Sequence, residues 1–192
     1  MTPFQIVMLL ATAFFAYKIY EFVQNMEEPT AEGHRRRASG PEAADAAGLV
    51  DAADNAFEAG ELGEAKALLS EADVLSPDTP EILNKLGFIL SKEGDIERAL
   101  EHYNRSLEID GKDDLVHNAL ASLYRERGEF DRAREHYEAA LAIDDAYEVT
   151  YFNYGNLLVA TGDRDAARRM YGKALELKPD FMQAKFELEK LS

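Results

Sequence analysis

The chain has 192 residues, a formal net charge of −16 and no cysteine. The lack of cysteine excludes disulfides, thiolate zinc sites and cysteine nucleophiles. The negative charge argues against a nucleic-acid duplex as a partner, because phosphate binding is driven by Lys and Arg, and it fits either solubility or attraction of a basic partner.

The amino-terminal stretch is apolar, and residues 4–17 contain no charged side chain. The apolar run is about 20 residues long, which is near the length that crosses a bilayer core as a helix. Lys18 and Glu21 fall near its far end, where long side chains reach the headgroups. We therefore predict that residues 1–23 form a single transmembrane anchor helix.

Two alternatives to a spanning helix fit the same residues less well. A cleaved signal peptide has a basic first region and a small-residue cleavage site, but no basic residue precedes Phe4 and no such site follows the run. A surface-lying amphipathic helix has one polar face, whereas residues 4–17 are apolar nearly all round.

Basic residues near the span predict its orientation. None precedes it, while Lys18 and the run 34–37 (His-Arg-Arg-Arg) follow it, so the remainder of the chain is expected in the cytoplasm. A periplasmic location is the alternative. Residues 24–45 mix Pro, Gly, Ser, Ala and charged residues without an apolar period, which is typical of a flexible linker.

From residue 46 onward, residue types recur every 34 positions without insertion or deletion. One column of this repeat is glycine: Gly60, Gly94, Gly128 and Gly162. A second is alanine: Ala65, Ala99, Ala133 and Ala167. A third is a large ring or leucine: Leu69, Tyr103, Tyr137 and Tyr171. Such a period indicates stacked structural repeats.

The period divides the chain into four units: 46–79, 80–113, 114–147 and 148–181. Each unit contains two helical patterns joined at the recurring glycine, which permits a left-handed turn at a helix end. Asp163, like Asp95, is placed to cap the second helix. Alanines let the two helices approach closely and the ring fills the space between neighbours. Residues 182–192 continue the first-helix pattern and predict a capping helix.

This pattern resembles the tetratricopeptide repeat, a 34-residue helix-turn-helix motif. The last unit carries its consensus residues at Tyr151, Tyr154, Gly155, Leu158, Ala167, Tyr171, Ala174 and Pro179. The resemblance covers residues 46–181 and implies an all-α fold: a right-handed superhelix of four units plus the capping helix, with a concave inner surface, preceded by the transmembrane helix.

Catalytic and metal-binding patterns are missing from the sequence. No two of the four histidines are spaced i, i+4. His102 and His136 hold equivalent repeat positions, where we expect solvated side chains, and His117 replaces a packing residue, where we expect a half-buried one. We predict a protein that is not an enzyme and that uses no cofactor or metal.

The resemblance implies that the first helix of each unit lines the concave groove, where a protein or peptide partner binds. The candidate partner-binding residues are Asn84, Phe88, Lys92, Asn118, Ser122, Arg125, Phe152 and Asn156. The wider groove set adds Val50, Asp54, Phe57, Ser91, Leu115, Val149 and Val159. Apolar groups mixed with amides suit a peptide bound by side-chain pockets and hydrogen bonds.

Chaperone-tail binders of this family hold acidic carboxyl termini in a clamp of Lys, Asn, Asn, Lys and Arg. From the first unit the corresponding residues are Val50, Asp54, Lys85, Leu115 and Ala119. From the second they are Asn84, Phe88, Ala119, Val149 and Asn153. Neither set pairs cations with two carboxylates, so we expect no recognition of an acidic tail.

The order of a membrane anchor, a basic segment and cytoplasmic repeats resembles that of bacterial inner-membrane assembly factors. We therefore expect a membrane-anchored adaptor or scaffold that binds a protein or peptide partner, with no nucleic-acid partner. The alternatives are a periplasmic assembly factor for envelope proteins or cytochromes and a self-assembling scaffold, which would be a homo-oligomer.

Overall fold

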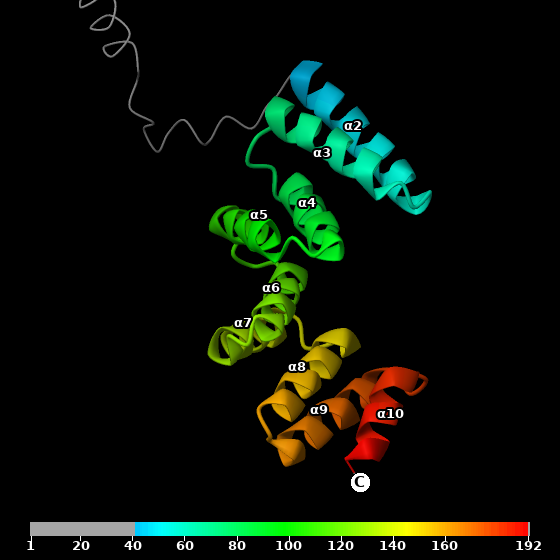
Figure 1. Cartoon of the computed structure of the whole chain (residues 1–192), viewed down its shortest axis with the longest axis vertical. Helices are drawn as coiled ribbons and strands as arrows, with labels where there is room; N and C mark the ends of the chain where they lie inside the picture. The colour runs from blue at the N-terminus through cyan, green and yellow to red at the C-terminus, as the bar shows by residue number, and fades with distance from the viewer. Residues whose placement is uncertain (1–40, 192) are drawn as a thin grey trace, which may run out of the picture. The chain divides into compact units, whose positions relative to one another are not determined.

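The computed structural model describes residues 41–191, and their regular structure is entirely helical, which confirms the predicted all-α class. Nine helices follow one another in this range (Figure 1). They are α2 (Pro41–Glu58), α3 (Leu62–Leu75), α4 (Pro80–Glu93), α5 (Ile96–Ile109), α6 (Asp114–Glu126), α7 (Phe130–Ile143), α8 (Glu148–Ala160), α9 (Arg164–Leu177) and α10 (Met182–Lys190).

The predicted anchor at residues 1–23 lies outside the described residues. Of the helices within 41–191, none combines the length and the apolar character that a bilayer span requires. The predicted linker, 24–45, overlaps the structure only at its end, where residues 41–45 already belong to α2. Proline is favoured in a first helical turn and the residues after it are good helix formers, so the helix starts earlier than the repeat pattern indicates.

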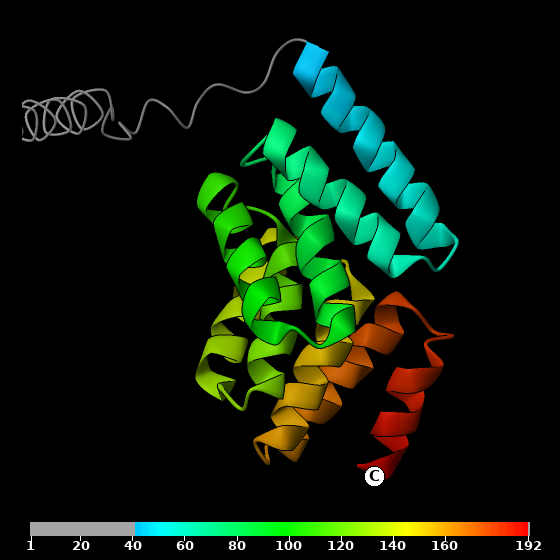
Figure 2. The same cartoon turned by 45° about the horizontal axis from the view of Figure 1, so that its top comes forward.

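The helices pack as successive pairs. Within a pair, α2 lies on α3, α4 on α5, α6 on α7 and α8 on α9, as Figure 2 shows from a second direction. Neighbouring pairs meet where α3 contacts α4, α5 contacts α6 and α7 contacts α8, and α10 packs on α9. Each pair therefore buries its remaining apolar surface against the next, as expected for stacked repeats.

Each pair turns at the recurring glycine. Gly60, Gly94, Gly128 and Gly162 have φ angles of 76° to 86°, a left-handed conformation that residues with a Cβ adopt only with strain. At Gly94 the next N–H, of Asp95, donates to the carbonyl of Leu90 at 2.9 Å, which closes the helix end. The predicted caps are confirmed, since Asp95 accepts the N–H of Arg98 and Asp163 accepts that of Ala166.

The repeated alanines and rings form the core. Ala99, Ala133 and Ala167 are fully buried, and Tyr137 and Tyr171 are at most 1% exposed. The rings lie directly against glycines of the first helices. A Cβ placed on Gly87 would be 3.0 Å from the ring of Tyr103, and one on Gly155 would be 2.5 Å from that of Tyr171. Glycine at these positions therefore allows the close approach of α4 to α5 and of α8 to α9.

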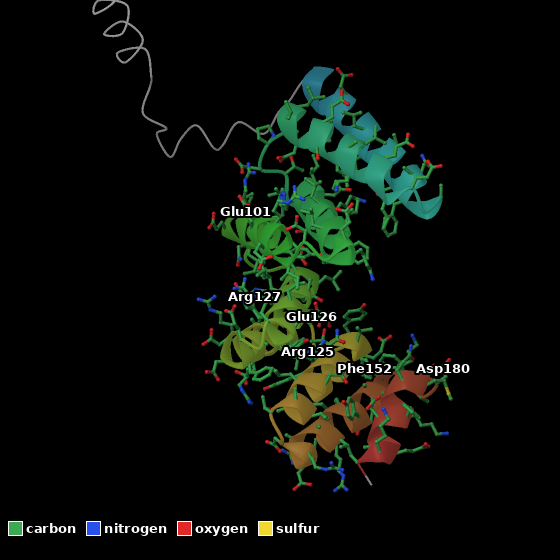
Figure 3. All side chains as sticks on the ribbon, viewed as in Figure 1. Glu101, Arg125, Glu126, Arg127, Phe152 and Asp180 are labelled. Carbon is green, nitrogen blue, oxygen red and sulfur yellow. The ribbon has the colours of Figure 1, made fainter. Side chains whose placement is uncertain are left out.

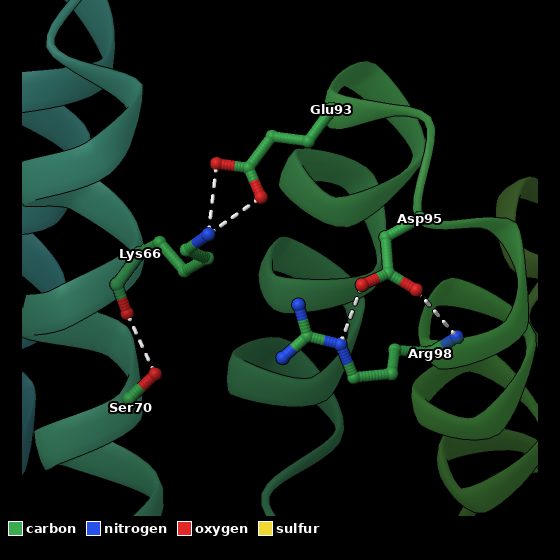
Figure 4. A network of polar contacts seen from close by, with 5 residues as sticks. All are labelled: Lys66, Ser70, Glu93, Asp95 and Arg98. Carbon is green, nitrogen blue, oxygen red and sulfur yellow. Dashed lines mark hydrogen bonds and ion pairs between the residues drawn. The ribbon is translucent and has the colours of Figure 1, made fainter.

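Ion pairs connect the first two helix pairs on the surface. The ammonium of Lys66 in α3 donates to both carboxylate oxygens of Glu93 in α4, at 2.6 and 2.8 Å (Figure 4). Beside it, Asp95 accepts the Nε–H of Arg98 at 2.6 Å. Exposed pairs of this kind contribute about 0–1 kcal/mol each, so apolar contacts of α3 with α4 supply most of the stabilisation at this junction.

Two histidines differ from expectation: His136 in the third pair of helices and His102 in the second. His136 is half-buried rather than solvated: its Nδ1 lies 2.9 Å from that of His117, and its ring stacks on Tyr124 with centroids 5.4 Å apart. Burial, with His117 and Arg132 nearby, lowers the pKa of His136 to about 4. His102 is also partly buried, and burial lowers its pKa. The prediction was wrong because helical periodicity alone does not show which surface positions a neighbouring helix covers.

The low pKa of His136 predicts that the folded chain loses stability on acidification. Between about pH 4 and 6.5 the unfolded chain binds a proton at this residue that the folded chain excludes, so the free energy of unfolding falls as pH falls through this window. Between neutral pH and about pH 5, the melting temperature should fall further for the natural chain than for His136→Gln. Equal drops would show that this histidine does not cause the acid sensitivity.

Candidate functional site

The first helices of the units form one continuous surface. α4 contacts α6 and α6 contacts α8, in addition to the contacts within each pair. We call the surface formed by α2, α4, α6 and α8 the first-helix face. It is the surface on which the candidate partner-binding residues were predicted.

A cavity of about 480 Å³ opens on the first-helix face between α2, α4 and α6. This volume lies within the range of about 300–1,000 Å³ that is usual for ligand sites. Its apolar lining includes Phe57, Leu69, Phe88, Ile89, Leu115 and Val116. Its polar lining comprises Asp54, Asn84, Lys85, Tyr103, Asp113, Asn118 and Tyr147.

Three of the apolar side chains at the cavity leave much of their surface uncovered. Phe57 and Phe88 meet edge to face with ring centroids 5.6 Å apart, and they are 38% and 41% exposed. Leu115 is 56% exposed. Single exposed apolar residues are ordinary, but three of them around one cavity form a local apolar surface that can bury a partner's side chain.

The polar side chains at the cavity are held by one another and by helix ends. Asp113 is the N-cap of α6 and accepts the N–H of Val116 at 3.0 Å through Oδ1. Its Oδ2 accepts from Nδ2 of Asn84 at 2.9 Å. On the opposite side, Lys85 of α4 donates to both oxygens of Asp54 of α2, at 2.6 and 2.9 Å. These bonds fix the walls before any ligand arrives.

The surroundings of the cavity shift the pKa of a buried phenol in its lining, that of Tyr103. Burial raises the pKa of Tyr103 strongly, a hydrogen bond with Ser91 opposes the shift, and the charge of Asp113 adds to it. Tyr103 is therefore a neutral hydroxyl at any physiological pH. Among the residues that the structure describes, no group of three or more His, Asp or Glu side chains is arranged to hold a metal.

Of the eight candidate residues, Asn84, Phe88 and Asn118 line the cavity. Lys92 is adjacent, because its ammonium lies 5.1 Å from the centroid of the Phe88 ring. The oxygen of the Asn118 side chain accepts from Asn153 at 3.3 Å. The structure thus brings together half of the predicted set around one site.

The other four candidates lie along α6 and α8 outside the cavity lining. Ser122 is hydrogen-bonded to the hydroxyl of Tyr137 at 3.0 Å, and Asn156 accepts from the hydroxyl of Tyr171 at 2.8 Å. Phe152 packs on Tyr171 and on Phe181, and Arg125 is partly buried near the end of α6 (Figure 3). Arg125 lies beside the hydroxyl of Tyr137, so all four have neighbours within the fold.

Asp113, Tyr147 and Lys85 are cavity residues that the candidate set did not contain. Asp113 and Tyr147 occupy the same repeat position, the N-cap of a first helix. The predicted groove positions lie within the helices, whereas this column precedes each first helix, although the 34-residue period aligns it. Lys85 lies in α4 beside Asn84, and its role depends on Asp54 of another unit.

Comparisons with known proteins agree with the architecture. A family model described as tetratricopeptide repeat matches residues 78–146 and 115–180. No curated protein sequence matches the chain. Among solved structures, MamA from Desulfovibrio magneticus RS-1 (41 to end) is similar with a TM-score of 0.71 and 19% identity, over 80% of this chain and 85% of that one.

Two further solved structures are similar to parts of the chain. YrrB, described as a TPR protein with an unusual peptide-binding site, has a TM-score of 0.67 and 22% identity over 75% of this chain and 74% of its own. The first TPR domain of Spaghetti (RPAP3), bound to the HSP90 peptide SRMEEVD, has a TM-score of 0.57 and 25% identity over 58% of this chain and 89% of its own.

The likeness to MamA and YrrB, at these identities, establishes the fold alone. The family model carries more weight, because its two matches together span residues 78–180, which is more than half of the chain. Three of the four glycine turns, three of the four buried alanines and all three buried tyrosines of the repeat columns lie within this range. The chain belongs to the tetratricopeptide repeat family.

Proposed function

We propose that this protein binds a polypeptide segment in the cavity of the first-helix face. The observation that carries the proposal is a cavity of about 480 Å³ between three helices with the exposed rings of Phe57 and Phe88 at its wall. The peptide-binding site named for YrrB and the peptide bound to Spaghetti support a polypeptide as the ligand of this chain.

The cavity suits recognition by an anchor side chain with hydrogen bonds beside it. A Leu, Phe or Met side chain of the partner, buried against the two rings, contributes about 1.5–3 kcal/mol. The amides of Asn84 and Asn118 offer donors and acceptors to the partner's backbone. Because both amides are already oriented by neighbours, little side-chain entropy is lost on binding.

An acidic chaperone tail is a poor ligand for this cavity. The cation at the site, Lys85, is already paired with Asp54 and lies 3.7 Å from Glu81. Asp113 places another carboxylate in the wall. A carboxylate-rich tail such as the HSP90 peptide of the Spaghetti complex would meet like charge here, so we propose a different class of partner.

We further propose that residues 1–23 anchor the chain in a membrane, with the repeats on the cytoplasmic side. The uncharged run at residues 4–17 and the basic residues after it support this arrangement. Tethering raises the effective concentration of the cavity toward membrane-bound partners, which suits an adaptor in the assembly of membrane or envelope complexes. A periplasmic orientation and a self-assembling scaffold are the competing arrangements.

Photocrosslinking from the cavity tests the proposed function. A photoreactive amino acid at Leu115, in the full chain in its native membranes, is expected to capture a polypeptide. Phe186 of α10 is the matched control, because it is 59% exposed against 56% for Leu115 and is not a cavity residue. The same captured species from both positions, or capture from Phe186 alone, would contradict binding at the cavity.

A further inference from the structure

We infer that the occupant of the cavity is a cationic polypeptide segment, in which a bulky apolar side chain is flanked by Lys or Arg. This rests on the proposed function and specifies the partner's chemistry. It follows from four observations: the distribution of charge along the chain, the carboxylate of Asp113 without an ion pair in the described residues, the side-chain oxygen of Asn84 without a donor there, and the neutralised ammonium of Lys85.

The net charge of the protein lies entirely in residues 41–192, most of which form the repeats. Residues 1–40 contain four basic and four acidic side chains, so the whole excess of −16 belongs to residues 41–192. A surface of one sign attracts partners of the other sign over about a Debye length, near 8–10 Å in physiological salt, and accelerates their association. The repeats therefore favour the approach of basic segments and disfavour acidic ones.

At the cavity, the carboxylate of Asp113 has no cation paired with it among the side chains that the structure describes. Both of its oxygens accept hydrogen bonds, but the donors are the neutral N–H groups of Val116 and Asn84. No Lys or Arg within residues 45–191 forms an ion pair with it. A carboxylate in a cavity wall with only neutral partners is stabilised further when a cation binds beside it.

A second side chain in the same wall, Asn84, has an acceptor without a donor in the described structure. The side-chain oxygen of Asn84 is buried and has no hydrogen-bond partner within the described residues, while its nitrogen donates to Asp113. A lysine ammonium or arginine guanidinium carries donors only, and so matches a wall that presents acceptors. A carboxylate or a carbonyl would leave this oxygen without a donor.

Lys85, the cation in the cavity lining, does not make the net charge of the lining positive. Lys85 lies 2.6 Å from Asp54 and 3.7 Å from Glu81, so two carboxylates face one ammonium. Lys92, the next cation, is not part of the lining and lies over the Phe88 ring. With Asp54, Asp113 and Lys85 as its charged lining, the cavity is net negative beside an apolar surface.

Selection from randomised dodecapeptides displayed on phage tests this inference. The target is the full chain in a mild nonionic detergent, and the comparison is Asp113→Asn. Asparagine caps helices as well as aspartate, so this variant keeps the cap of α6 and removes the charge. Its side-chain nitrogen replaces the oxygen that accepts from Asn84, so the Asn84 amide must turn over to keep that hydrogen bond. An unchanged melting temperature verifies that it folds.

The expected outcome is enrichment of peptides with a bulky apolar residue next to Lys or Arg. A representative peptide, made synthetically, should bind Asp113→Asn about tenfold or more weakly. Its affinity for the natural chain should also fall as salt is added. Enrichment of acidic or neutral peptides, or equal affinity for the two chains, would overturn the inference while leaving peptide binding intact.

Two further outcomes separate this inference from the proposed function. Selected peptides that bind a Phe88→Ala chain as well as the natural one would contradict the cavity as the site, and with it the proposed function. Peptides that are enriched only after Arg35, Arg36 and Arg37 are replaced by serine would show that the chain's own basic run occupies the cavity. That result would overturn the assignment of a separate partner.

Discussion

Replacing Gly155 with alanine is expected to destabilise the repeats by about 1–3 kcal/mol, the usual cost of overpacking a core. The new Cβ would lie 2.5 Å from Cε1 and 2.7 Å from Cδ1 of Tyr171. That ring is 1% exposed and its hydroxyl donates to Asn156, so it has no free space into which to move. The gain in helix propensity from glycine to alanine, about 0.5–1 kcal/mol, is smaller than the clash.

Two other glycines make the test specific. Gly172 of α9 has no heavy atom within 4 Å of an added Cβ, so Gly172→Ala is expected to be neutral or to stabilise by up to about 1 kcal/mol. Gly87→Ala, at 3.0 Å from Tyr103, should fall between the two. Urea unfolding of the full chain measures all three. Equal effects at Gly155 and Gly172 would show that α8 and α9 do not approach closely.

Phe88→Ala is expected to weaken binding of a cavity peptide by about tenfold or more, because a buried ring at the centre of an interface contributes about 2 kcal/mol or more. Phe88 is 41% exposed in the free chain, so most of the loss should appear in binding rather than in folding. The dissociation constant of a selected peptide, measured by fluorescence anisotropy, gives the effect directly.

Phe186→Ala is the matched control for that measurement. It removes the same ring from another exposed position, in α10, where the ring packs under the ammonium of Lys190 at 4.1 Å. Its dissociation constant should equal that of the natural chain. An equal loss in both variants would mean that peptides adhere to exposed rings in general and not to the cavity.

The sequence predicts those parts of the fold that depend on local geometry and nearest neighbours. The left-handed turn at Gly94, the cap at Asp95 and the buried ring of Tyr137 each need only a residue type at a fixed place in the repeat. Because the units share these contacts, a wrong prediction for a residue in one unit is exposed by the equivalent residues of the other units. The predicted anchor at residues 1–23 has no such internal check and stays a prediction.

The location of the site was less predictable, because it depends on which polar groups the fold itself uses. The ninth residue of the third unit, Ser122, bonds to the tyrosine 15 residues later, Tyr137, and Asn156 bonds to Tyr171 in the same way. In the second unit that ninth residue is Phe88, which cannot make this bond and lines the cavity.

The first unit also lacks the hydrogen bond between its ninth residue and a tyrosine. Its ninth residue, Asp54, has Leu69 in place of the tyrosine, so its carboxylate pairs with Lys85 across the unit boundary. The first two units therefore differ from the last two. This difference can be found in the sequence once it is known that the ninth residue pairs with the residue 15 positions later. Helical periodicity treats all four units alike and does not reveal it.

The structure of the full chain with a selected peptide bound tests the central claim most directly. We expect a bulky apolar side chain of the peptide to lie between Phe57 and Phe88, with the peptide running along the first-helix face. A peptide bound on the opposite side, against the second helices, or a cavity filled by other residues of the same chain would contradict it.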